Sequence, residues 1–151
     1  MKSMQKFTGR FTRSLVAAAA CTLLGGAAVA QDRTAAPAGA EVYIISPADG
    51  AKVSNPVVVR FGLKGMGVAP AGIKLDNTGH HHLLIDTDLP EDMSKPLPVV
   101  ENKVVHYGKG QTETSLTLPA GKHTLQLVVG DYLHIPFDPP LVSKKITVTV
   151  K

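Results

Sequence analysis

The sequence of 151 residues has one cysteine and no tryptophan, and aromatic residues make up only 5% of it. The cysteine, Cys21, lies within the first thirty residues, so the rest of the chain has no disulfide bond to stabilise it. A core without tryptophan and with few other aromatic rings must be largely aliphatic. The chain after Cys21 is long enough to bury such a core as one domain.

The common motifs of several enzyme classes are also missing. The sequence has no G-x-S-x-G elbow and no H-E-x-x-H pair. The glycine-rich stretch 62–72 lacks the Lys-Ser/Thr ending of a phosphate-binding loop, and no evident helix follows it. The sequence therefore gives an enzyme little support, although a hydrolytic or redox metal centre without a named substrate stays open.

The first thirty residues have the pattern of a secretory signal peptide, with a basic head, an apolar run and small residues at a cleavage site. Lys2, Lys6, Arg10 and Arg13 precede the apolar run, which ends in A-V-A at Ala30. We predict cleavage near Ala30 and a mature protein that is periplasmic or secreted, with no stable membrane insertion.

Two alternatives to cleavage are less favoured. An uncleaved membrane anchor is disfavoured because the apolar run contains two glycines and is close to the minimum span of about 17 residues. Lipid attachment at Cys21 is disfavoured because the residue three places before it, Ala18, is small.

The net charge depends on the leader. Four of the 16 basic residues and none of the 12 acidic residues lie in residues 1–30, so the remaining chain is formally neutral. The basic pI therefore gives no support to binding of nucleic acid.

After the leader, the pattern changes to β-structure. Residues 31–40 are small and polar, which predicts a disordered linker. From residue 41, short β-branched segments alternate with turn residues, and no long segment has a helical period. Residues 41–151 therefore predict an all-β domain, an immunoglobulin-like antiparallel β-sandwich of about seven strands. The expected strands lie within residues 41–46, 57–63, 80–87, 104–107, 111–118, 123–129 and 141–151.

Three of the six histidines, His80, His81 and His82, stand in a row at the start of one expected strand. Alternate side chains of a strand share a face, so His80 and His82 point to one side with Leu84, and His81 points to the other with Leu83. His80 and His82 lie about 7 Å apart along a strand, a separation that two imidazoles can close onto one ion. The pair predicts a platform for two metal ligands.

The other histidines divide into two groups. His123 is in register with the apolar residues of its strand, and for His123 as for His81 we favour a structural histidine bonded to the backbone. His106 and His134 lie in loop-like stretches, where binding residues concentrate. We expect His106 or His134 to complete a metal site with the H-x-H pair.

Two acidic residues have open roles. Asp131 follows a strand and either orients a histidine or caps its own loop, the commoner role. Glu113 alternates outward from its strand and either approaches the site or is an ordinary exposed carboxylate.

Several long segments carry a family resemblance. VYIISPADG, VRFGLKGMGVAPAG, NTGHHHLLIDTDLP, GQTETSLTLPAGKHTLQLVVGD and HIPFDPPLVSKKITVTVK together resemble a family of small exported bacterial proteins known as domain of unknown function 4399. The resemblance covers nearly all of residues 41–151 and implies no established activity. It implies that the histidines at matching positions recur in the family: His80, His81, His82, His106, His123 and His134.

The chain departs from that pattern at Phe137 and Tyr132, where the resemblance leads us to expect histidine. If those positions bind metal in relatives, the resemblance implies a metal site with fewer ligands in this chain.

Two functions of different classes follow. The first is binding of a transition metal, copper as Cu(II) or zinc as Zn(II), because imidazole suits these ions and the chain after residue 30 has no cysteine thiolate for Cu(I). The second is an immunoglobulin-like structural or protein-interaction module, with a protein partner, in which the histidines bond the loops to the sheet and no metal binds.

Overall fold

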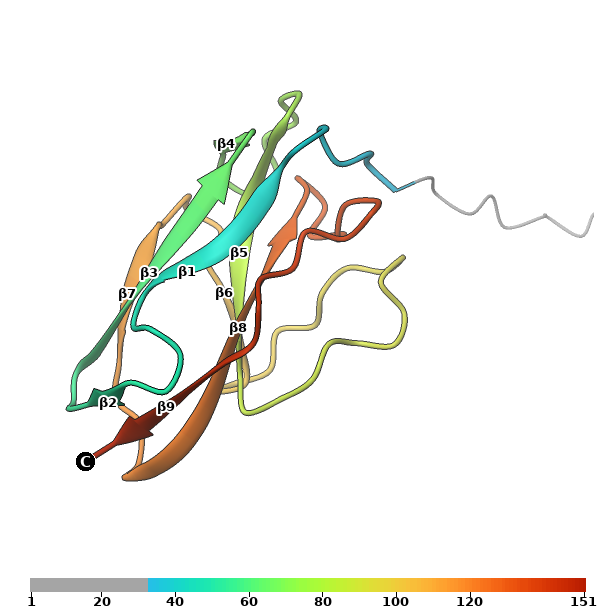
Figure 1. Ribbon diagram of the computed structural model, residues 1–151. Coiled ribbons are helices and arrows are strands. Elements are labelled where there is room, and N and C mark those ends of the chain that lie inside the picture. Colours follow the sequence, from blue (N-terminus) through green and yellow to red (C-terminus); the bar gives the residue numbers. More distant parts are fainter. Residues whose placement is uncertain (1–32) are drawn as a thin grey trace, which may run out of the picture. The chain divides into compact units, whose positions relative to one another are not determined.

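The computed structural model describes residues 33–151, which form nine β-strands and no helix (Figure 1). The all-β prediction is confirmed, and the seven strands of three or more residues overlap the seven predicted segments. The predicted leader, residues 1–30, lies outside the described residues. The strands are β1 (Glu41–Ser46), β2 (Lys52–Val53), β3 (Val57–Lys64), β4 (Gly67–Val68), β5 (Thr78–Ile85), β6 (Val104–His106), β7 (Glu113–Leu116), β8 (Gly121–Gly130) and β9 (Ile146–Val150).

The strands form two sheets. The smaller sheet has the order β1-β3-β7, and both of its pairs are antiparallel. The larger sheet has the order β2-β9-β8-β5-β4, and β6 also pairs with β5. The two-residue strands β2 and β4 pair in parallel with β9 and β5, and the other pairs are antiparallel. No helix that could span a membrane occurs in residues 33–151.

The main core lies between the two sheets and follows from the period of two along their strands. In β3, Val57, Val59 and Phe61 alternate with exposed residues, and all three are at most 4% exposed. From the larger sheet, Leu125 and Leu127 are fully buried in the same cluster. The alternation in β3 reflects one buried and one solvated face of the smaller sheet, and it sets the register of that strand.

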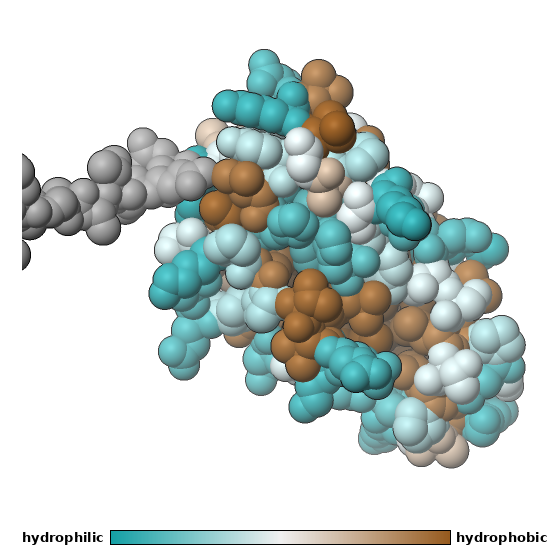
Figure 2. Space-filling view, turned by 180° about the vertical axis from the view of Figure 1, so that it is seen from behind, coloured by the Kyte–Doolittle hydropathy of each residue, from teal (hydrophilic) through white to brown (hydrophobic). Residues whose placement is uncertain are grey.

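The outer face of the larger sheet is covered as well, so β5 is buried on both faces over nearly its whole length. The connection 86–103 lies on the side of this sheet away from β1 and β3 (Figure 1), whereas residues 136–143 of the connection 131–145 run beside β8 at the edge of the sheet. Leu84 and Val128 form a second apolar cluster there with Leu97 and Val104. The opposite view shows apolar patches bordered by hydrophilic side chains (Figure 2). The connection 86–103 and the turn at His134, joined by the hydrogen bond from Leu97 N to His134 O, make a third layer, under which polar side chains of β5 become buried.

The segment 33–40 differs from the disordered linker that the sequence predicts. Ala36 N donates to Asp138 O at 2.8 Å, and Asp138 N donates to Thr34 O at 2.8 Å, so the segment runs along the chain at Asp138 as a short bridge. The Thr34 hydroxyl also bonds to the Asp131 carboxylate. Small residues suit this close backbone pairing, which the composition alone does not indicate.

Candidate metal centre

The strand β5 presents His80 and His82 on the outer face of the larger sheet. His81 contacts Phe61 of the opposite sheet, with ring centroids 5.2 Å apart, so it points into the main core. The predicted alternation is therefore present in the structure. His80 is 1% exposed and His82 is fully buried, because the connections of the third layer cover this face.

The strand β6 brings a third imidazole beside this pair. His106, expected in a loop-like stretch, ends β6 and lies directly opposite His82 in the antiparallel register. Opposite residues on neighbouring strands hold their side chains close together. The rings of His82 and His106 stack at an interplanar angle of 27°, with centroids 5.0 Å apart.

The fourth imidazole comes from the loop after β8. His134 adopts a left-handed conformation, with φ of 67°, in a turn that Asp131 caps. The Oδ1 atom of Asp131 accepts hydrogen bonds from Leu133 N at 2.9 Å and from Ile135 N at 3.0 Å, the residues on either side of His134. The capping role of Asp131 is thus the one that its hydrogen bonds show.

Four rings converge as a result. The centroid of His80 lies 4.8 Å from that of His82, 5.0 Å from that of His106 and 5.0 Å from that of His134. His134 is 4.7 Å from His106 but 6.1 Å from His82. We call these four residues the histidine cluster. Its three strand-borne members form a compact trio, and the loop-borne member lies at one side.

The trio has a spacing that suits metal ligation. One ring nitrogen from each of His80, His82 and His106 lies within 4.8 Å of the others, so this group could hold a metal ion. Tetrahedral coordination at about 2.0–2.1 Å places ligand nitrogens about 3.4 Å apart, which modest ring rotations can reach from this arrangement.

Two glycines leave room for these rings. A β-carbon at Gly108 would lie 2.2 Å from Cε1 of His106, and one at Gly130 would lie 2.9 Å from Cε1 of His82. The Gly130 position also faces the backbone of His134 at 3.3 Å. Side chains at these two positions would displace the rings, so both glycines are needed for the cluster to close.

The cluster contains buried nitrogens without hydrogen-bond partners in the described protein. Both ring nitrogens of His80, both of His82, and Nε2 of His106 are buried in this way. A buried polar atom without a partner costs about 1–3 kcal/mol, and most such atoms in proteins are paired. Five of them in one place are expensive for a purely structural cluster and suit a cationic ligand.

The sequence comparison places the chain in a family. The profile of a family described as a domain of unknown function (DUF4399) matches residues 59–151. The chain belongs to this family. No curated protein and no solved structure gives a significant match. The matched range of the DUF4399 domain includes all four residues of the histidine cluster.

Burial and mutual proximity lower the pKa values within the cluster of this DUF4399 domain. Loss of solvent, followed by the charges of His106 and His134, lowers the pKa of His80 from 6.5 to about 4. Loss of solvent, followed by the charge of His80, lowers the pKa of His82 to about 2. The pKa of His106 is lowered by the same two causes, first burial and then His134. These imidazoles are neutral near pH 7, which is the form that ligates a metal.

The remaining two histidines have structural positions. His81 Nδ1 lies 3.3 Å from Gln111 O, and its ring packs in the main core. His123 Nδ1 lies 2.6 Å from the Asp86 carboxylate and Nε2 lies 2.9 Å from Pro119 O, so both nitrogens face acceptors and both donate in the imidazolium form. The hydrogen bond with Asp86 raises the pKa of His123.

Three other candidate positions lie outside the cluster. Glu113 pairs with Arg60 at 3.2 Å on the exposed surface of the smaller sheet. Phe137, where the resemblance leads us to expect histidine, is 1% exposed and packs in the main core. Tyr132 lines a surface pocket, with Lys74 Nζ 5.5 Å from its ring centroid. None of the three side chains is part of the histidine cluster.

Proposed function

We propose that this DUF4399 domain binds one divalent transition-metal ion, Cu(II) or Zn(II), through His80, His82, His106 and His134. The observation that carries the proposal is the convergence of four imidazoles with five buried, unpartnered ring nitrogens. Imidazole nitrogens are ligands that both ions favour. Three of the four come from hydrogen-bonded strands, which fixes their spacing before an ion binds.

The positions of the two methionines after the leader support these ions over Cu(I). Met66 packs against the main core and Met93 against the second apolar cluster. Both thioethers therefore serve packing, and the histidine cluster presents nitrogen alone. Cu(I) prefers soft sulfur ligands, whereas Cu(II) and Zn(II) accept an all-imidazole set.

We also propose that the protein is exported, to the periplasm or beyond the cell. The basic head and the small residues at Ala30 support export through a cleaved leader. In that location the domain would meet extracellular metal ions without competition from its own thiols, because Cys21 leaves with the leader.

The alternative is a structural or protein-interaction module without metal. It accounts well for His81 and His123, whose nitrogens bond to backbone or carboxylate oxygens. It gives no partner to the five buried nitrogens of the histidine cluster. His81 and His123 thus fit a structural role, whereas the histidine cluster fits metal binding.

Calorimetry tests the proposal. The chain from Gln31 onward, which forms one compact unit, is titrated with Zn(II) and with Cu(II) at pH 7. We expect one ion per chain, and an affinity at least about 30-fold weaker in the His80→Ala/His82→Ala variant, because two ligands are lost. The matched control is His123→Ala, which removes a histidine near the opposite end of β5 and should keep the parent affinity. Equal affinity in the parent and the double variant would refute the proposal.

A further inference from the structure

The segment 33–36 is bonded to the loop that carries His134. The Arg33 guanidinium donates to Pro136 O at 3.0 Å and to Phe137 O, and it pairs with the Asp138 carboxylate at 3.2 Å. Backbone hydrogen bonds of 2.8 Å join the segment to Asp138 in both directions. We call residues 33–36 the strap. It is fixed to the loop after β8 by side chains and by backbone.

One carboxylate connects the strap to His134. Asp131 is 4% exposed, and its Oδ2 accepts the Thr34 hydroxyl at 2.6 Å. Its Oδ1 accepts the amides of Leu133 and Ile135, which flank His134. One carboxylate group therefore makes the hydrogen bond with Thr34 and the hydrogen bonds that hold the backbone on both sides of His134.

His134 needs such support more than the other members of the cluster. The three strand histidines are held by the β-ladder, whereas His134 lies in a loop at φ 67°, a conformation that is strained for a residue with a side chain. Its own backbone bonds are both 2.9 Å long: His134 N donates to Asp131 O within the turn, and Leu97 N of the connection 86–103 donates to His134 O. The position of its ring is thus set by loop contacts.

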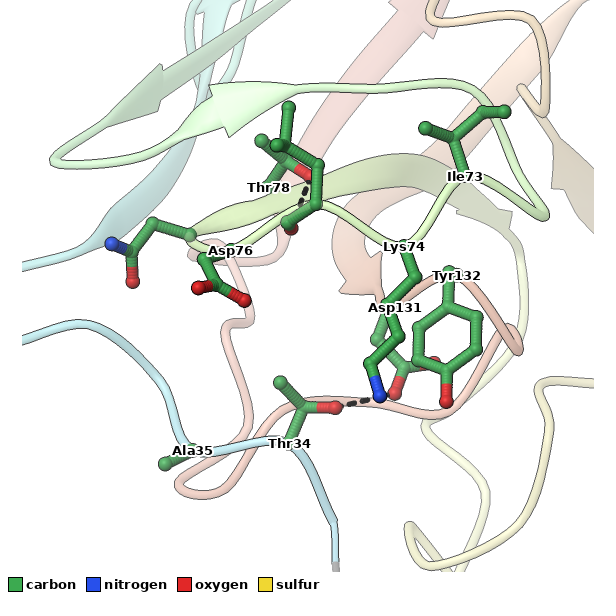
Figure 3. Close-up of a pocket in the computed structure, with 10 residues that line it drawn as sticks. Thr34, Ala35, Ile73, Lys74, Asp76, Thr78, Asp131 and Tyr132 are labelled. Atoms are coloured by element: carbon green, nitrogen blue, oxygen red, sulfur yellow. Dashed lines mark hydrogen bonds between the residues drawn. The ribbon is translucent and has the colours of Figure 1, made fainter.

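There is open space beside these contacts. Thr34, Asp131 and Tyr132 line a pocket of about 340 Å³ together with Lys74 and Asp76 (Figure 3). The hydrogen bond between Thr34 and Asp131 crosses one side of this pocket (Figure 3). If that bond is lost, the Asp131 turn has room to move toward the pocket and to carry His134 with it.

We propose that the strap regulates the metal site by holding His134 in its ligating position, so that release of Thr34 from Asp131 converts a site of four histidines into one of three. This inference rests on the proposed metal binding. The strap begins shortly after the predicted cleavage site at Ala30 and lies outside residues 59–151, the range that the family profile matches. Thr34 and Asp131 are positioning residues, and His134 is the ligand through which they act.

A double-mutant cycle tests the coupling with Cu(II) as the probe. The chains are the parent from Gln31, Thr34→Val, His134→Ala and the combined variant. Loss of one hydrogen bond should make Thr34→Val release Cu(II) to a chelator about three- to tenfold faster than the parent. In the His134→Ala background, the same substitution should have no further effect. The matched control, Thr117→Val, changes an exposed threonine away from the strap and should leave the rate unchanged.

A metal-free measurement separates this inference from the proposed function. Hydrogen exchange at the amides of Leu133 and Ile135 should be about tenfold faster in Thr34→Val and unchanged in Thr117→Val, because the first variant loosens the carboxylate that accepts both amides. A parent that binds no Cu(II) refutes the metal function and the strap's role with it. A parent that binds Cu(II), with Thr34→Val releasing it at the parent rate or acting equally in the His134→Ala background, refutes the strap alone.

Discussion

The metal-free domain is expected to lose about 4 kcal/mol of unfolding free energy between pH 7 and pH 5 through His80 and His82. The pKa values of His80 and His82 are about 4 and about 2 in the folded chain, below the 6.5 of an unfolded one. The unfolded state therefore binds more protons below pH 6.5, and acid favours unfolding. The loss begins as pH falls through 6.5 and, for His80, levels off near pH 4. Denaturant unfolding at a series of pH values in the presence of a chelator measures it.

His81 and His106, whose pKa values are also lowered, first by burial, add to this loss in the same direction. His123 has a raised pKa, so its stabilisation is complete below pH 6.5 and is lost only as pH rises through its folded pKa. Asp49 has a pKa lowered by the hydrogen bond from Lys144, so its contribution is lost mainly below pH 5. The control is His80→Gln/His82→Gln, which lacks the two most strongly shifted imidazoles, keeps His81 and His106, and should lose stability with falling pH much less steeply than the parent. A variant whose stability falls with pH as steeply as that of the parent would contradict the assignment to the cluster.

Replacing His82 by leucine should stabilise the metal-free domain by about 2 kcal/mol at pH 7. His82 is fully buried, and neither of its ring nitrogens has a hydrogen-bond partner in the described protein. Leucine has a similar volume, removes two unpaired polar atoms and continues the apolar face that Leu84 and Val128 already form. Thermal and denaturant unfolding in the presence of a chelator provide the measurement.

The comparison variant is His123→Leu, which should lose about 1–3 kcal/mol. Its imidazole bonds to Asp86 and to Pro119 O, and leucine would leave the Asp86 carboxylate without this partner. Opposite signs for the two substitutions would separate a histidine kept for binding from one kept for folding. If His82→Leu is as damaging as His123→Leu in the absence of metal, then His82 has a structural role and the cluster loses its main support as a ligand site.

The local pattern of the sequence was sufficient for the fold class and for the faces of β5. The row of three histidines followed by apolar residues predicted that His80 and His82 share one side and that His81 takes the other, and both sides are as predicted. A period of two is a property of the strand itself, so it needs no knowledge of distant residues.

Features that depend on distant pairings could not be predicted in the same way. His106 stands in a stretch that is ambiguous by composition, and its place opposite His82 follows from the register of β6 on β5. No local pattern indicates that the proline-rich connection 86–103 covers the outer face of the sheet and buries the cluster. The hydrogen bonds of the strap are made with residues about one hundred positions away. Local composition therefore predicts only a disordered linker there.

The most direct test of the metal centre is X-ray absorption at the zinc edge of the chain from Gln31 loaded with one equivalent of Zn(II). Scattering from the outer atoms of imidazole rings counts histidine ligands independently of affinity. We expect a first shell of nitrogen at about 2.0–2.1 Å with four imidazoles, falling to three in His134→Ala. A shell made mainly of oxygen, or one with fewer than three imidazoles in the parent, would contradict the proposal that these converging rings bind the metal.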